Sequence, residues 1–267
     1  MLASGLAEAQ GTYGTKVQAG DPDIGLPLSQ FAAIPPGLIL SQSNFWISYW
    51  DLNANGLYDA QDVPYLQFGS TNFFPPAQRI VRANNIRLAG WGNYPAGSYV
   101  KASDPDIGQQ LNTWPLYVLP SAPAVGFYYL NVAGTAGYDL EDPVYLKVLS
   151  NPLLNQLGTN DIRITGYANY PAGSRVSITD IDAGKDLTAF VAPIVPPLAN
   201  QMGGPSAATG GPIGSFMFFN ANGNVAGPVP PNPAFSAIFD DGDVVYFHVG
   251  ASVAGGAAVG PGDIRLF

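Results

Sequence analysis

Carboxylates are the side chains whose types and spacing in this chain best suggest chemistry. Most of the 19 Asp and Glu residues fall in two patterns, D-x-D and D-x-x-D, and each pattern is used three times. Clustered carboxylates repel one another unless a cation compensates them, and oxygen ligands without His or Cys favour Ca2+. We therefore expect the two turns of each repeat to lie together and share calcium, although Asp also forms turns on its own. The expected ligands are Asp21, Asp23, Asp59, Asp62, Asp104, Asp106, Asp139, Asp142, Asp180, Asp182, Asp240 and Asp243.

The stretch DLNANGLYDAQD, residues 51–62, is the fullest of these acidic turns. Its oxygen-bearing side chains follow the spacing of an EF-hand calcium loop, with Gly56 at the sharp turn. The stretch resembles the calcium loop of dockerin modules, which also end in Asp, and the resemblance implies a bound calcium ion. The implied ligands are Asp51, Asn53, Asn55, Asp59 and Asp62. A dockerin loop continues into a helix, whereas residues 63–66 predict a strand, and the later copies keep fewer of these ligands.

The composition predicts a β-protein and excludes several classes of binding partner. Hydrophobic residues make up 47% of the 267 residues, enough for a packed core, and the 32 Gly and 25 Pro alternate with aromatic and β-branched runs, as in sheets with many turns. The net charge of −9, with only 10 Lys and Arg, argues against nucleic acid or an anionic membrane as a partner. The chain has no Cys and one His, which excludes disulfides and a His-rich metal site. No apolar run is long enough for a transmembrane segment.

One pattern runs three times along the chain, with a period of about 80 residues. Residues 85–100 match residues 161–176 closely, and the segments around the D-x-D turns match as well. We predict an all-β fold of three tandem small β-sandwich modules, with a single three-fold barrel or propeller-like arrangement as the alternative. The predicted modules are residues 1–84, 85–160 and 161–267, the last with a Gly/Pro-rich insertion at about 201–235. The predicted strands are 45–50, 65–69, 78–82, 86–91, 98–103, 127–132, 144–149, 162–168, 174–179, 215–220, 243–249 and 263–267.

The motif x-I-R-[IL] lies between the copies and again in DIRLF, which is Asp263, Ile264, Arg265, Leu266 and Phe267. If the motif opens the module that follows it, the first module lacks a strand and DIRLF is spare. DIRLF of one copy would then complete the next copy by β-strand addition, and this head-to-tail contact would grow a filament. Residues 1–10 are a second candidate for the donated strand. If the motif instead closes the module before it, DIRLF finishes the third copy and nothing is exchanged.

Tandem β-modules, few charges, no Cys and acidic turns resemble donor-strand pili and calcium-dependent surface-layer proteins. The resemblance implies a structural subunit of an extracellular filament, sheath or surface layer, built from copies of itself and stabilised by calcium. The alternative is a calcium-dependent adhesin module that binds glycans through loop aromatics. We expect no enzyme: paired acids suit glycoside hydrolysis, but a catalytic pair seldom needs three copies. The one histidine, His248, is expected to be a partly exposed strand residue.

Overall fold

The structure is a computed structural model, and all that follows concerns the residues that it describes. These are residues 12–30, 45–68, 79–112, 125–132, 134–135, 137–148, 156–190, 214–221, 225–226, 236–237, 243–249 and 257–266. They form strands and turns and contain no helix, which confirms the predicted all-β class. No helix capable of crossing a membrane occurs among them.

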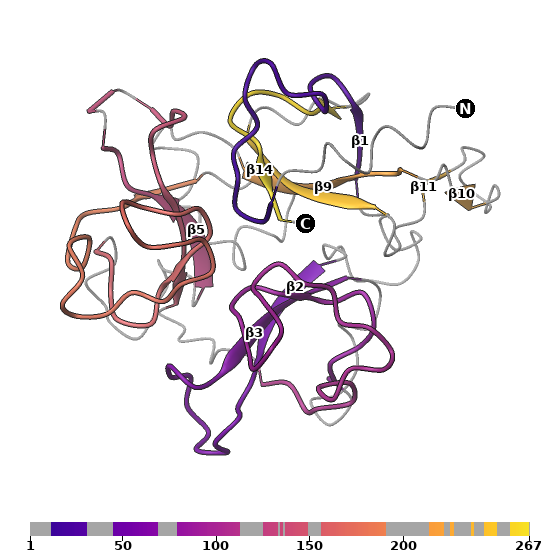
Figure 1. The fold of residues 1–267 in the computed structure, drawn as a ribbon, viewed down its shortest axis with the longest axis vertical. Coiled ribbons are helices and arrows are strands. Elements are labelled where there is room, and N and C mark those ends of the chain that lie inside the picture. Colours follow the sequence, from indigo (N-terminus) through magenta and orange to yellow (C-terminus); the bar gives the residue numbers. More distant parts are fainter. Residues whose placement is uncertain are drawn as a thin grey trace, which may run out of the picture.

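Three antiparallel sheets carry the sequence repeat (Figure 1). Module A, residues 45–112, has the strand order β2-β3-β4, and module B, residues 125–190, has the order β7-β6-β5-β8. Module C joins residues 12–30 to residues 214–266 in the order β13-β1-β9-β12-β14, and β10 and β11 form a separate pair. The strands are β1 (Pro27–Gln30), β2 (Phe45–Trp50), β3 (Val63–Phe68), β4 (Ile86–Arg87), β5 (Val125–Tyr129), β6 (Val144–Val148), β7 (Ile162–Arg163), β8 (Thr188–Ala189), β9 (Gly214–Phe219), β10 (Val225–Ala226), β11 (Ser236–Ala237), β12 (Val244–Val249), β13 (Ala257–Ala258) and β14 (Ile264–Arg265).

A pair of long strands forms the centre of each sheet: β2 with β3, β5 with β6, and β9 with β12. These strands are rich in aromatic and β-branched residues, which fit a pleated surface. The D-x-x-D turn stands directly before the second strand of each pair, so that its last Asp lies where that strand begins. The sheet therefore fixes the position of one of the two acidic turns.

The I-R motif closes the module before it, which is the second of the two alternatives left open by the sequence. β4 pairs with β3, β7 pairs with β6, and β14 pairs with β12. The sheets therefore cross the predicted boundaries at residues 84 and 160. DIRLF completes module C within its own chain through β14, while Phe267 lies outside the described residues.

Module C is split between the two ends of the sequence. Residues 12–30 lie beside β14 in Figure 1, where the indigo segment runs along the yellow one. β1 pairs with β9 and with β13, and an isolated bridge joins Lys16 to Ile264. In modules A and B the equivalent segment follows the I-R strand directly in sequence.

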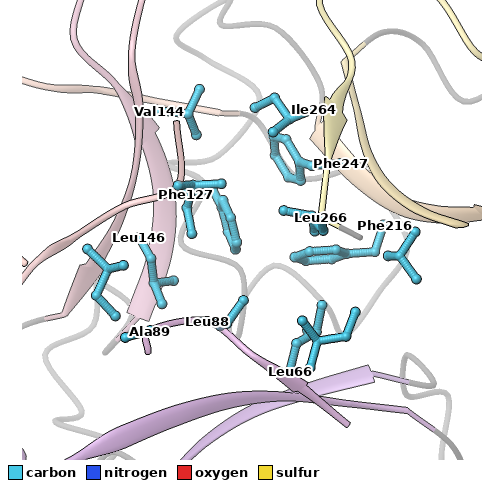
Figure 2. Packing of buried hydrophobic residues seen from close by; sticks show 14 of the residues in the cluster. Leu66, Leu88, Ala89, Phe127, Val144, Leu146, Phe216, Phe247, Ile264 and Leu266 are labelled. Atoms are coloured by element: carbon cyan, nitrogen blue, oxygen red, sulfur yellow. The ribbon is translucent and has the colours of Figure 1, made fainter. Parts of the chain in front are cut away.

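The three modules share one hydrophobic core (Figure 2). Leu66 of module A, Leu146 of module B and Leu266 of module C belong to the same buried cluster. The rings of Phe127 and Phe247, from modules B and C, stack with their centroids 4.7 Å apart. The modules are therefore parts of one closed ring, close to the three-fold alternative, and are not independent units along a string.

Among the described residues, irregular chain covers the outer face of each module. In module B, Tyr145 on β6 packs with Val176 and Leu187 from the segment that carries the D-x-D turn. Equivalent clusters occur in modules A and C. Each module thus has two layers, a sheet and a D-x-D segment, and the second acidic turn is held against the sheet.

Three tight turns meet where the modules join. Gly14, Gly97 and Gly173 occupy them with φ angles of +74°, +81° and +77°, a region that favours glycine. A Cβ atom on Gly97 would lie 2.4 Å from the Cβ of Tyr13, and one on Gly173 would lie 2.1 Å from that of Ala96. The backbones approach so closely that only glycine fits at these positions.

Candidate functional site

Each D-x-D turn folds onto a buried arginine from the I-R strand. In module B, Nε and Nη2 of Arg163 donate to the two carboxylate oxygens of Asp182 at 2.9 and 2.6 Å, and Nη2 also donates to Asp180 at 2.7 Å. The hydroxyl of Tyr145 donates to Asp182 at 2.9 Å. The side chains of Arg163 and Asp182 are both fully buried. This is the bidentate arrangement that a planar guanidinium makes with a carboxylate.

The remaining donors of Arg163 are also satisfied. Nη1 donates to the hydroxyl of Ser174 at 3.2 Å and to the carbonyl of Arg175 at 2.9 Å. The guanidinium carbon lies 4.0 Å from the centre of the Tyr170 ring, within the range of a cation–π contact. Since a buried charge without partners is costly, the cluster is stable only when strand, turn and D-x-D segment are all in place.

Modules A and C repeat this cluster. The matching residues are Arg87, Asp104, Asp106 and Tyr65 in module A, and Arg265, Asp21, Asp23 and Tyr246 in module C. Their Nη2–carboxylate distances are 2.8 and 2.7 Å in module A and 2.7 and 2.6 Å in module C. The arginine of module A is 17 and 19 residues from its acids, whereas that of module C is 244 and 242 residues away.

The D-x-D carboxylates thus have an arginine as counter-charge at the place where the sequence analysis expected calcium. In the described ranges, no group of three or more Asp, Glu, His or Cys side chains is arranged to hold a metal ion, as a calcium site shared by the two turns of a repeat would need. The first Asp of each D-x-D turn has a lowered pKa and is therefore charged at neutral pH; these residues are Asp21, Asp104 and Asp180. The backbone N–H of Ser177, followed by Arg163, lowers the pKa of Asp180, and Asp21 has a lowered pKa for the same two reasons.

The last Asp of each D-x-x-D turn is buried and binds backbone N–H groups. Asp62 accepts hydrogen bonds from the N–H groups of Leu52 and Asp59 at 3.0 and 2.8 Å. Asp142 accepts the equivalent two bonds at 2.8 and 3.1 Å, and Asp243 accepts one at 3.0 Å. Burial raises the pKa of Asp62, against the opposing effect of these bonds. These carboxylates therefore do what the turn-forming alternative predicted.

The backbone carbonyl of the same Asp joins neighbouring modules. Each carbonyl accepts a hydrogen bond from the residue two positions after the glycine of a neighbouring tight turn. The three pairs are Arg175 with Asp62, Tyr99 with Asp243, and Lys16 with Asp142. The contacts run once around the ring, from module B to A, from A to C and from C to B. Every joint between modules thus uses a D-x-x-D turn.

Lys16 shows how tightly these joints are packed. Besides Asp142, its ammonium donates to the carbonyls of Asp139 and Leu140 at 3.2 and 2.9 Å. It lies 4.8 Å from the centre of the Tyr138 ring. Burial lowers the pKa of Lys16 to about 8, although the charges of Asp142 and Asp139 act in the opposite direction. The ammonium is therefore held mainly by backbone carbonyls inside the joint.

Residues 51–62 contain more carboxylate and amide side chains than residues 131–142, the equivalent stretch of module B. The amide groups of Asn53 and Asn55 both donate to Asp59 Oδ2, at 2.8 and 2.7 Å. Asp51 accepts two backbone N–H groups of the same loop, at 3.1 and 2.7 Å. Four of the five expected calcium ligands thus lie within one small, exposed loop.

Calcium fits this loop in part. Carboxylate and amide oxygens are suitable ligands, but the fifth expected ligand, Asp62, already accepts two backbone hydrogen bonds. In module B, Thr135 stands near Asp139 and donates to it at 2.9 Å, so that loop offers fewer oxygens. In module C, Asp240 lies outside the described residues.

A third repeated polar pair links the second central strand to the residue before each I-R strand. The pairs are Gln67 with Asn85 at 3.5 Å, Lys147 with Asp161 at 3.4 Å, and His248 with Asp263 at 2.9 Å. The expectation of a partly exposed His248 is wrong, because its exposed fraction is 8% and its Nδ1 contacts the Asp263 carboxylate. This pair is not predicted from the sequence, although the repeated motif [ND]-I-R, with Asn or Asp directly before each I-R strand, is a signal for it.

The fold and the site together define a ring of three all-β modules, each of which contains a buried arginine–carboxylate cluster and is joined to its neighbours through a D-x-x-D turn. No family model matches the chain, and neither the curated proteins nor the solved structures include a significant match.

Proposed function

We propose that the protein is a structural subunit of an extracellular filament, sheath or surface layer, and that it has no catalytic role. The observation that carries this proposal is the use of its charges. The described D-x-D acids bind buried arginines, and the last acid of each D-x-x-D turn binds backbone N–H groups. Groups used in this way specify one packing of the modules and are not free to act on a substrate.

The architecture also suits a rigid building block. The three modules share one core, and hydrogen bonds between modules run once around the ring. A closely packed interior transmits strain with little deformation. Such a unit would keep its shape when many copies carry a mechanical load.

Calcium is the stabilising ion in this proposal, and residues 51–62 are its site. Asp51, Asn53, Asn55 and Asp59 would hold the ion, which would neutralise the exposed carboxylates of the loop. Chelated protein should then show heat on titration with Ca2+ and melt at a higher temperature when the ion is added. Asp59→Asn should lose most of both effects, whereas the matched variant Asp139→Asn in module B should keep them. Absence of heat and of a melting shift in the unaltered protein counts against calcium.

Electron microscopy tests the structural role itself. Concentrated protein should be imaged with and without Ca2+, and we expect regular filaments, tubes or sheets when the ion is present. Particles that stay single at every concentration, with or without the ion, count against the proposal. A glycan array tests the adhesin alternative on the same sample. Specific binding of a glycan by protein that stays as single particles would support that alternative.

A further inference from the structure

Residues 12–30 form a separable segment that completes module C. In modules A and B the equivalent segment is joined to the I-R strand through a short turn, seen in the bridges Trp91–Tyr94 and Tyr167–Tyr170. In module C no such connection exists, because residues 12–30 and β14 lie at opposite ends of the sequence. All the contacts that hold this segment against the rest of module C are therefore non-covalent.

These contacts are extensive and specific. Gly14 and Val17 donate backbone hydrogen bonds to Arg265 and Asp263, both at 2.8 Å, and β1 pairs with β9 and β13. The carboxylates of the segment complete the Arg265 cluster, and Leu28 fills the apolar cluster on the outer face. Without residues 12–30, Arg265 would be left without its carboxylates and the apolar outer face would be uncovered.

The segment also binds both of the other modules. The hydroxyl of Tyr13 donates to the carbonyl of Leu88 in module A at 3.1 Å, and Lys16 binds carbonyls of module B. The described contacts of the segment would be the same whichever copy of the chain supplied it. Exchange between copies therefore neither adds nor removes a contact within the ring. Whether the segment binds its own copy or a neighbouring copy then depends on the protein concentration and on the length of the connection between the segment and β2.

We propose that residues 12–30 are the exchanged segment of the assembly: the segment of one copy completes module C of the next copy, with its Asp21 and Asp23 on that copy's Arg265. This inference rests on the proposed structural role and replaces DIRLF by residues 12–30 as the donor. Residues 31–44 connect the segment to β2. At roughly 3.3–3.6 Å per residue, a stretch of this length spans at most about 50 Å, so exchange requires a neighbouring ring within that distance. Where each copy gives its segment to one neighbour and accepts a segment from another, the contact is heterologous and extends.

Cysteine pairs test the exchange in the full chain, which has no native Cys. Pro27 and Ala258 are exposed register partners across the seam in module C. Gln156 and Asp186 occupy the equivalent exposed positions in module B, where both belong to one continuous stretch of chain. Opposed residues of antiparallel strands are close enough for a disulfide.

The double variants P27C/A258C and Q156C/D186C would be oxidised at high protein concentration and run on a non-reducing gel. Exchange predicts a ladder of covalently linked chains for P27C/A258C and monomers for Q156C/D186C. Monomers for both variants overturn the exchange, and equal ladders for both overturn it as well, because the links are then non-specific. Micrographs of the same samples separate the two proposals. Filaments with only internal disulfides keep the structural role and reject exchange, whereas linked closed dimers without filaments keep exchange and reject the filament.

Discussion

Modules B and C contain the same buried cluster in two different covalent settings. In module B, Arg163 binds acids that are 17 and 19 residues away, and in module C, Arg265 binds acids that are 244 and 242 residues away. The Nη2–carboxylate distances are nevertheless 2.7 and 2.6 Å in both modules. The repeated residues therefore determine the geometry of the cluster, while the order of the chain determines which segments the cluster connects. In module B it connects segments that are close in sequence, and in module C it connects the two ends of the sequence.

Removal of the arginine should have the largest effect and should separate the two settings. Arg163→Met and Arg265→Met each leave two carboxylates without their counter-charge, one of them deeply buried. We expect each to lower the free energy of unfolding by about 3–5 kcal/mol, measured by urea denaturation. Only Arg265→Met should also release residues 12–30, which hydrogen exchange would detect as lost protection in that segment.

Equal protection of residues 12–30 in both arginine variants would contradict the assigned role of the module C cluster. The double variant Asp21→Asn/Asp23→Asn serves as a control, because it removes the charges from the other side of the same contact. It should release the same segment as Arg265→Met.

A methyl group added at a tight turn between modules, by a Gly→Ala substitution, should have the next largest effect on stability. Gly97 and Gly108 have nearly the same φ, +81° and +80°, but only Gly97 has neighbours within 4 Å of an added Cβ. Gly108→Ala should cost about 1–2 kcal/mol from the left-handed backbone alone. Gly97→Ala should cost about 1–3 kcal/mol more, because the new methyl overlaps with Tyr13. Equal melting temperatures for the two variants would mean that the turns do not meet as described.

Alkaline pH should weaken modules B and C alike. Burial, followed by the charge and hydrogen bond of Asp182, raises the pKa of Tyr145 above its usual value of 10.0, and burial next to Asp23 does the same for Tyr246. Below pH 10 these phenols are protonated in the folded and unfolded chains. Above it, the unfolded chain ionises first, so stability falls by up to about 1.4 kcal/mol per pH unit for each phenol.

Denaturation in urea between pH 8 and 12 measures this loss. Tyr145→Phe and Tyr246→Phe should each make the decline with pH shallower. A tyrosinate signal near pH 10 that becomes smaller in Tyr145→Phe or Tyr246→Phe, with no accompanying unfolding, would show that the replaced hydroxyl group is accessible to solvent.

The smallest effect is expected where the modules already differ. The position occupied by Lys147 and Asp161 in module B is filled by the neutral pair Gln67 and Asn85 in module A. Lys147→Gln/Asp161→Asn copies that neutral pair and should change stability by less than about 1.5 kcal/mol, since both charges leave together. Lys147→Met alone removes the counter-charge of the buried Asp161 carboxylate, which keeps the backbone N–H of Gly158 as a donor, and should cost about 3–5 kcal/mol by urea denaturation. Equal costs for the two variants would show that the pair does not act as a unit.

The sequence predicts the strands better than the partners of the acids. The aromatic and β-branched runs that form β2, β5 and β9 are visible in the local sequence, and so is the repetition of the acids. The arginine partners also leave a trace, because Arg87 and Arg163 stand at one spacing before their D-x-D turns. The partners of Arg265 have no such local signal, because residues 21–23 are far away in sequence and contact Arg265 only in the folded ring. The irregular segments that cover the outer faces of the sheets likewise cannot be predicted from hydrophobic periodicity, because they have no regular period.

The number of calcium ions bound per chain tests most directly whether arginine balances the D-x-D carboxylates. Calorimetric titration of chelated protein should give no more than one ion per chain, and Asp59→Asn should lose most of that binding. Three or more ions per chain that persist in Asp59→Asn would place calcium at the D-x-D turns and contradict the assignment of arginine as their counter-charge.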